Sequence, residues 1–130
     1  MEEIIMTILL VTPGQQPKKI TIDGTLAAMQ RIVGGPIQAV YPFEEPVALI
    51  CHEEGKFLRL PLNRALRSPD TGEIYDIIAG DFFLCAAPPD SEHFESLTDD
   101  HLLRYAQIFR TPEMFLSGPG GSIIVLPLPV

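Results

Sequence analysis

Apolar residues recur along this chain in short runs separated by clusters of glycine, proline and acidic residues. Residues 19–23 alternate polar and apolar with the period of two that is typical of a half-buried strand. Turn-forming residues separate the runs at 12–14, 42–46 and 69–72. The pattern predicts strands over residues 4–11, 19–23, 37–43 and 47–51.

The central part of the chain predicts further β-structure. Residues 47–51 and 57–60 flank a short acidic loop, which favours a hairpin in which Gly55 takes the left-handed conformation. Pro61 then predicts a short turn or helix over residues 61–66. A long strand-like stretch follows over residues 73–86, and its Ala-Gly pair predicts a bend.

Two stretches have the 3.6-residue period of a helix. The first has Asp23 or Thr25 as N-cap and ends at Gly34, which can adopt the left-handed cap conformation. The second has Thr98 as N-cap and ends near Pro112. The apolar residues at helical spacing are Leu26, Met29, Ile32 and Val33 in the first helix, and Leu102, Tyr105, Ala106 and Phe109 in the second.

The C-terminal residues differ in composition from the rest. Residues 117–122 are glycine, serine and proline, which predicts a flexible linker, and residues 123–130 form an apolar tail. We expect the tail to add a strand to its own sheet or to dock on another subunit. The predicted organisation is a single α+β domain over residues 1–116 followed by this linker and tail. Its sheet is mostly antiparallel and can curl into a barrel-like shape, with one packed helix and a C-terminal helix.

Length and charge narrow the classes of function. A chain of 130 residues fits one domain, and its apolar runs are shorter than the roughly 20 residues of a membrane-spanning helix. The net charge of −8, with scattered basic residues, argues against direct binding of nucleic acid. The acidic start of the chain is unlike a secretory signal, so we expect a cytoplasmic protein.

No constellation in the sequence predicts catalysis. The histidines His52, His93 and His101 lack metal-ligand spacing, and His52 and His101 are expected to be exposed. Cys51 and Cys85 lie in apolar runs and resemble small core residues more than nucleophiles. We therefore expect no catalytic residue, no metal site and no cofactor, and enzymatic activity is the least supported class.

A set of polar residues can instead bind a small anion. Arginine matches the geometry of phosphate or carboxylate, and asparagine can pair with the edge of a base. Asn63 and Arg64 stand out because they interrupt an otherwise apolar region. A structural alternative stays open, in which Asn63 caps a turn and the arginines are solvated. The candidate ligand-binding residues are Arg31, Tyr41, Lys56, Arg59, Asn63 and Arg64.

Over about its first ninety residues the chain resembles domain-of-unknown-function family 3846. The blocks that carry this resemblance are Ile32-Val-Gly-Gly35, Tyr41-Pro-Phe43, residues 47–51, Glu53-Glu-Gly-Lys56, Leu60-Pro-Leu-Asn-Arg64 and Ile77-Ile-Ala-Gly-Asp-Phe-Phe83. His52 departs from the pattern, since such proteins often have asparagine there. The resemblance implies a protein of phages or conjugative mobile elements of bacteria, located in the cytoplasm of the bacterial host. Such proteins are sometimes found beside or fused to antirestriction-like domains, and the resemblance implies that the family retains the Asn63-Arg64 pair.

Three functional classes follow. In the first, a homo-oligomer sequesters a nucleotide-derived immune signal through the candidate residues, as a non-enzymatic counter-defence protein. In the second, the acidic surface engages a host protein, as an antirestriction DNA mimic would. In the third, the protein is a structural or accessory interaction module without a ligand site.

Overall fold

The computed structural model describes residues 5–128. Residue 4 of the first expected strand and residues 129–130 of the expected tail lie outside the described part. In chain order the elements are β1 (Ile5–Val11), β2 (Lys18–Asp23), α1 (Leu26–Val33), β3 (Ile37–Val40), β4 (Val47–His52), β5 (Leu62–Arg67), β6 (Ile74–Ala79), β7 (Phe82–Ala86), α2 (Asp99–Ile108), β8 (Glu113–Ser117), a 3-10 turn (Pro119–Gly121) and β9 (Ile123–Pro127).

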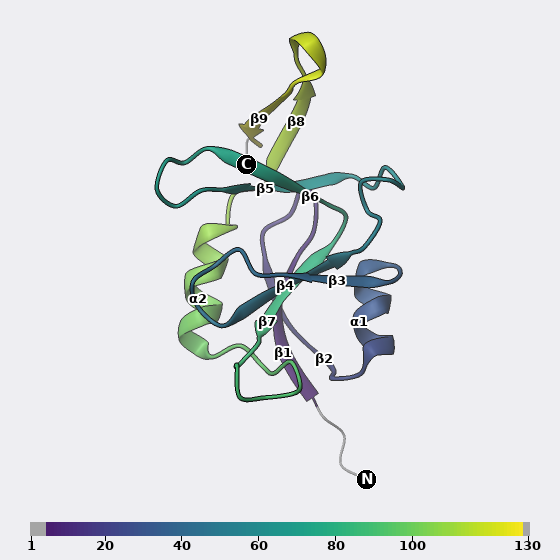
Figure 1. The fold of residues 1–130 in the computed structure, drawn as a ribbon, viewed down its shortest axis with the longest axis vertical. Coiled ribbons are helices and arrows are strands. Elements are labelled where there is room, and N and C mark those ends of the chain that lie inside the picture. The colour runs from purple at the N-terminus through teal and green to yellow at the C-terminus, as the bar shows by residue number, and fades with distance from the viewer. Residues whose placement is uncertain (1–4, 129–130) are drawn as a thin grey trace.

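A five-stranded antiparallel sheet forms the centre of the protein. Its strand order is β2-β1-β7-β4-β3, so β7 lies in the middle between two pairs of strands that precede it in the chain. The helices α1 and α2 cover opposite faces of this sheet (Figure 1). The expected α+β class with mostly antiparallel strands is confirmed. The barrel-like shape is wrong, because the sheet stays open with β2 and β3 at its edges.

The central strands have continuous apolar runs because helices cover both faces of the sheet. In β4, Leu49 packs in the core on the α2 side, whereas its neighbour Ile50 packs on the α1 side. Phe82 and Phe83 divide in the same way at the start of β7. Alternate residues of a strand face opposite sides, so a strand buried on both sides needs apolar residues at every position.

The long stretch over residues 73–86 is divided between two sheets. Gly80, with φ +81°, ends β6 and turns the chain into β7. β6 pairs with β5 in a separate antiparallel hairpin, whose turn closes where Gly72 N donates to Ser68 O at 2.8 Å. Residues 62–67 are therefore a strand, and the predicted short turn or helix over residues 61–66 is wrong.

The predicted hairpin between residues 47–51 and 57–60 is also wrong. β4 pairs with β3 and β7, and residues 53–60 form a series of tight turns. Gly55 is buried there, and a Cβ at this position would lie 2.9 Å from Ala79 O. The left-handed residue of the loop is Arg59, with φ 57°, and not Gly55.

Both helices begin and end as their capping residues predict. Thr25 Oγ1 accepts a hydrogen bond from Ala28 N at 3.1 Å, and Gly34 ends α1 with φ +86°. Thr98 Oγ1 accepts from His101 N at 3.2 Å at the start of α2. No helix within residues 5–128 is long and apolar enough to cross a membrane.

The C-terminal residues form a hairpin that projects from the body next to the β5–β6 hairpin (Figure 1). β8 and β9 pair antiparallel in a two-stranded sheet of their own. Residues 118–122 are the turn of this hairpin, and Gly118 N donates to Ser122 O at 2.7 Å. The predicted linker is thus a turn, and the tail adds a strand to the segment that immediately precedes it.

Candidate functional site

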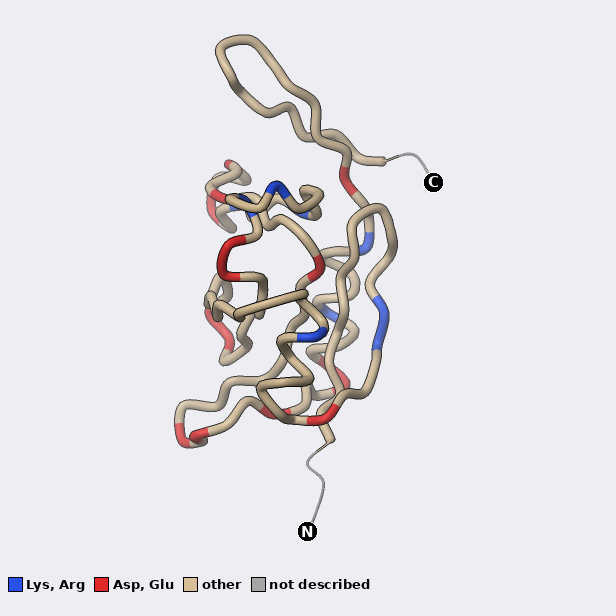
Figure 2. Tube along the Cα trace, turned by 90° about the vertical axis from the view of Figure 1, so that its right-hand side faces the viewer, with Lys and Arg blue, Asp and Glu red and all other residues tan. Residues whose placement is uncertain are grey.

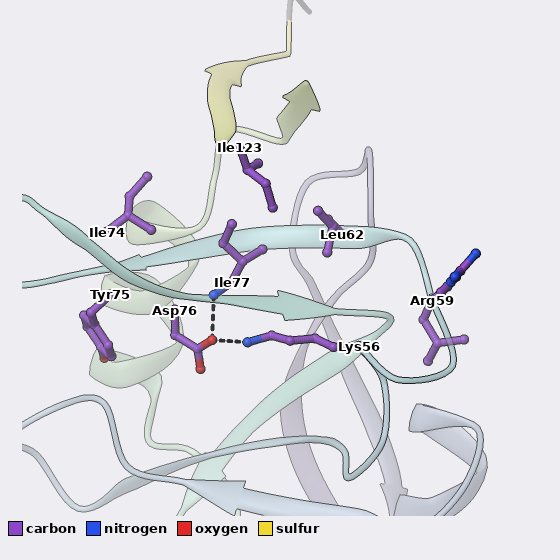
Figure 3. Close-up of a pocket in the computed structure, with 9 residues that line it drawn as sticks. Lys56, Arg59, Leu62, Ile74, Tyr75, Asp76, Ile77 and Ile123 are labelled. Atoms are coloured by element: carbon purple, nitrogen blue, oxygen red, sulfur yellow. Dashed lines mark hydrogen bonds and ion pairs between the residues drawn. The ribbon is translucent and has the colours of Figure 1, made fainter. Parts of the chain in front are cut away.

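An open groove of about 700 Å³ lies along β6. We call it the β6 groove. Its volume falls within the range of small-molecule sites, roughly 300–1,000 Å³. Figure 3 shows side chains from the turn-rich loop, both strands of the β5–β6 hairpin and the C-terminal hairpin around it. The lining residues are Lys56, Arg59, Leu60, Leu62, Ile74, Tyr75, Asp76, Ile77 and Ile123.

The two cations of the β6 groove differ in their partners. Lys56 Nζ is ion-paired with Asp76 Oδ1, and the same oxygen accepts a hydrogen bond from Ile77 N at 2.8 Å (Figure 3). Both side chains of this ion pair are substantially exposed, so the pair stabilises the fold only weakly. Arg59 takes part in none of the ion pairs found within residues 5–128. Its guanidinium is therefore available to a ligand.

Arg59 is held by an uncommon backbone. It is the one non-glycine residue with positive φ in the described chain. A left-handed conformation costs a residue with a Cβ about 1–2 kcal/mol, so the surrounding fold must impose it. The buried Gly55 and the hydrogen bond from Leu60 N to Gly55 O, at 3.0 Å, close the loop and fix this geometry. Lys56 and Arg59 are thereby presented from one rigid turn.

Asn63 and Arg64 lie in the interior and not in the groove. Their exposed fractions are 0% and 1%. Asn63 Nδ2 donates to Val11 O at 2.9 Å and to Gly80 O at 2.8 Å. These bonds join β5 to the end of β1 and to the β6–β7 turn.

All five N–H donors of Arg64 are engaged within the protein. Nε and Nη2 donate to Phe109 O at 3.1 and 3.0 Å, and Nη2 also donates to Gln15 O at 2.6 Å. Nη1 donates to Oδ1 and O of Asn63, at 2.9 and 3.3 Å. Burial lowers the pKa of the guanidinium, and the charge of Glu113 partly opposes this effect. Neither Asn63 nor Arg64 offers a free donor to a ligand in this structure.

The remaining candidates lie elsewhere. Arg31 is exposed in the last turn of α1, and Tyr41 is exposed just after β3. Neither lines the β6 groove. Of the six candidate residues, the structure brings Lys56 and Arg59 together at an open site and Asn63 and Arg64 together inside the fold.

A second and larger groove, of about 1,050 Å³, lies between α2 and the β5–β6 hairpin. We call it the α2 groove. Two ion pairs join four of its charged side chains, since Arg67 Nη2 donates to Glu113 Oε2 at 2.6 Å and Arg104 Nη1 donates to Glu45 Oε2. Pairing within the protein leaves this groove with fewer free polar groups for a ligand than its size suggests.

Glu45 connects the loop after β3 to α2. Its carboxylate accepts hydrogen bonds from Arg104 Nη1, from Tyr105 Oη at 2.6 Å and from His101 Nε2 at 2.8 Å. The bonds from Arg104, and then from Tyr105, lower the pKa of Glu45 to about 2. Burial and the bond to Glu45 raise the pKa of Tyr105.

His52 is buried, so its predicted exposure is wrong. The residue is 7% exposed, and its ring Nδ1 accepts a hydrogen bond from Glu54 N at 2.9 Å. Gly35 lies so close that a Cβ there would be 2.5 Å from His52 Nε2. His101 is half-buried and not exposed, because Glu45 and Tyr105 lie against its ring.

Both cysteines are buried in the core. Burial raises the pKa of both Cys51 and Cys85, the latter to about 12. Within residues 5–128 no three His, Cys, Asp or Glu side chains are grouped to hold a metal ion.

Sequence reasoning missed Tyr75, Asp76 and Ile123 as groove residues. The available signal was the turn at residues 69–72, which joins residues 61–66 to the strand-like stretch over residues 73–86. Pairing those two segments would have placed Tyr75 and Asp76 on the hairpin that follows Lys56 and Arg59. Ile123 had no such signal, because its position depends on the C-terminal hairpin.

The comparison with family models identifies the family. A domain of unknown function, DUF3846, matches residues 6–110. The chain belongs to this family. The match spans all elements from β1 through α2 and ends before the β8–β9 hairpin. No curated protein and no solved structure matches the chain significantly.

Proposed function

We propose that this DUF3846 protein is a non-enzymatic binding protein whose β6 groove holds a nucleotide-like anion. The observation that carries the proposal is Arg59, which lines this largely apolar groove, has a left-handed backbone and takes part in none of the ion pairs found within residues 5–128. In its most specific form the proposal is sequestration of a nucleotide-derived immune signal by a protein of phage or mobile-element origin.

The chemistry of the groove supports each part of such a ligand. The planar fork of Arg59 suits a phosphate, and two of the three N–H donors of Lys56 remain beyond its bond to Asp76. Tyr75 is 57% exposed at the groove wall and offers an aromatic face. Stacking of a base on an aromatic side chain contributes about 1–3 kcal/mol. Leu62, Ile74 and Ile77 form an apolar part of the lining, on the other side of β6 from the Tyr75 ring (Figure 3).

The test is calorimetry and thermal shift with cyclic nucleotides, ADP-ribose-like nucleotides and inorganic phosphate. We expect Arg59→Ala and Tyr75→Ala each to weaken binding of the best nucleotide at least about tenfold, since one such contact contributes 1.4 kcal/mol or more. Arg31→Ala is the matched control, because it removes the same charge from an exposed site outside the groove. It should leave the affinity unchanged.

Two results would contradict the proposal. One is the absence of binding to every nucleotide of the panel. The other is equal weakening by Arg59→Ala and Arg31→Ala, which would indicate general electrostatic attraction and no defined site. Asp76→Asn adds a positive check, because freeing Lys56 from its ion pair should strengthen phosphate binding.

The DNA-mimic alternative stays a prediction without a supporting observation. Such a mimic presents a row of carboxylates on one face. Figure 2 shows the Asp and Glu residues in separate short groups on several loops and elements. Three carboxylates, those of Glu45, Asp76 and Glu113, are bound to cations of the same chain.

A further inference from the structure

The C-terminal hairpin is an uncharged arm on a strongly acidic protein. We define the C-terminal arm as residues 114–127, the part of this hairpin that follows Glu113. From Met114 to the end of the chain there is no Lys, Arg, Asp or Glu, whereas the whole chain has a net charge of −8. The arm projects from the body (Figure 1), and four of its large apolar side chains are between 42% and 49% exposed. These are Leu116, Ile123, Ile124 and Leu126.

The outer edge of β9 has backbone groups ready to pair. Inside the arm, Leu128 N donates to Pro112 O at 2.8 Å and Gly118 N donates to Ser122 O at 2.7 Å. In an antiparallel ladder, pairs of residues that exchange backbone hydrogen bonds alternate with pairs that do not. The two bonds above therefore direct the backbone N–H and C=O groups of the even-numbered residues of β9 toward β8. Ile123 and Val125 therefore direct N–H and C=O outward. Within residues 5–128 no other strand pairs with this edge.

We propose that β9 pairs with β9 of a second copy of the chain, antiparallel about a two-fold axis at Ile124. Ile123 of each copy then exchanges backbone hydrogen bonds with Val125 of the other. Ile124 faces its own counterpart in a non-hydrogen-bonded pair, where Cα atoms approach to about 4.5 Å. The product is a four-stranded sheet in the order β8-β9-β9-β8.

Three observations favour a second copy as the occupant. A two-stranded hairpin is marginally stable alone, and the pairing raises the number of strands to four. Two copies with a net charge of −8 each repel one another, and the arm is a surface on which they can meet without opposing charges. A single antiparallel edge is self-complementary under two-fold symmetry, so one patch suffices for both partners.

The side chains of the arm match this register. Leu116 lies opposite Ile124 in the hairpin, and both are exposed on the same face. Pairing at Ile124 extends them into a row of four apolar side chains across the new sheet. The edge strand β2 of the large sheet differs, because Lys18, Lys19 and Asp23 protect it from such pairing.

The test uses charges at the self-opposed position. The unmodified chain should be a dimer in sedimentation and light scattering. Ile124→Glu and Ile124→Lys should each be monomeric, because like charges then face each other across the axis. An equimolar mixture of the two variants should form a heterodimer. A monomeric unmodified chain, dimeric single variants, or monomeric variants without recovery on mixing would each overturn the proposal.

Single cysteine substitutions in β9 test the register of the β9–β9 pairing independently. This test does not require a variant that abolishes the dimer. Ile124→Cys should form a disulfide between copies under oxidation, since Cys51 and Cys85 are buried. Leu126→Cys is the matched control, because it is equally exposed but would face Ser122 of the other copy. Equal cross-linking at both positions would contradict the register. Circular dichroism of each variant checks that the body is folded, and nucleotide binding is read separately because Ile124 does not line the β6 groove.

Discussion

Arg64 Nη1 donates a hydrogen bond to the side chain of its neighbour in sequence, Asn63 Oδ1, at 2.9 Å. The two side chains form one buried polar unit whose other acceptors are all backbone carbonyls. Apart from Asn63 O, those carbonyls belong to segments far apart in the chain, so the unit holds the β5–β6 hairpin to the large sheet and to the end of α2. The carbonyls are Val11 O, Gln15 O, Gly80 O and Phe109 O.

Replacement of Arg64 by lysine should destabilise the protein although it keeps the charge. Lysine lacks the planar fork, so it leaves several buried acceptors unpaired. We expect the free energy of unfolding to fall by about 2–4 kcal/mol in urea titrations, because buried unpaired groups cost about 1–3 kcal/mol each. Arg31→Lys is the control and should change it by less than about 0.5 kcal/mol. Similar small effects for both variants would show that the interior network contributes little.

Alanine at Gly80 should cost more than alanine at Gly14. Both glycines have positive φ, +81° and +75°, so each substitution carries the left-handed penalty of about 1–2 kcal/mol. A Cβ at Gly80 would in addition lie 2.8 Å from Leu60 Cδ1, whereas nothing lies within 4 Å at Gly14. The difference between the free energies of unfolding of the two variants, measured by thermal and urea unfolding, gives the cost of the contact with Leu60. Equal losses would mean that Leu60 moves aside without cost.

Glu45 should make stability depend on pH in acid. Its pKa is about 2 in the fold, below the ordinary value of 4.5. A carboxyl with a lowered folded pKa contributes stability above the unfolded pKa, and this contribution disappears as the pH falls through the folded pKa. The urea midpoints of the unmodified chain and Glu45→Gln should therefore differ most above pH 4.5 and converge toward about pH 2.

The control for this experiment is Glu44→Gln. Glu44 is exposed and its carboxylate makes no hydrogen bond within the described residues, so its substitution should produce no comparable convergence. A difference between Glu45→Gln and the unmodified chain that stays constant with pH would contradict the role of the ionised carboxylate.

The two cysteines should be unreactive in the folded protein. Burial raises the pKa of Cys85 to about 12 and also raises that of Cys51, so almost no thiolate is present at neutral pH. A chromogenic disulfide reagent should label both thiols rapidly in denaturant and only slowly without it. Fast labelling of the native protein would indicate that β4 and β7 separate frequently.

Local signals in the sequence made both helices and strand β2 predictable. The caps Thr25, Gly34 and Thr98 act within a few residues of their partners, so both helices could be located from sequence. The alternating run that forms β2 needed no distant information either. The open α+β sheet with helices on both faces could not be distinguished from a barrel, because the strand order depends on pairings such as Leu9 with Leu84.

The predicted hairpin after β4 failed because its acidic turn resembles a hairpin loop. The deciding contact is tertiary, since Gly55 lies against the backbone of Ala79. Residues 57–60 consequently complete a turn and do not return along β4. The sequence carries no local mark of that contact.

Asn63 and Arg64 show why the candidate site was only partly predictable. The sequence alone shows that these two polar residues interrupt an otherwise apolar region. Backbone carbonyls have no side-chain signature, however, so the sequence could not reveal that remote carbonyls satisfy these two residues. Lys56 and Arg59 were predictable as exposed polar residues because their exposure follows from the loop itself.

The central position of β7 has a consequence for synthesis of the protein. The pairs β1–β2 and β3–β4 both leave the ribosome before residues 82–86 do, and the two pairs do not hydrogen-bond to each other except through β7. The inner edges of β1 and β4 thus stay unpaired in the nascent chain. Unpaired edges and uncovered apolar faces favour association with other chains. The newly made protein is therefore most vulnerable to aggregation, and most dependent on chaperones, until its seventh strand emerges.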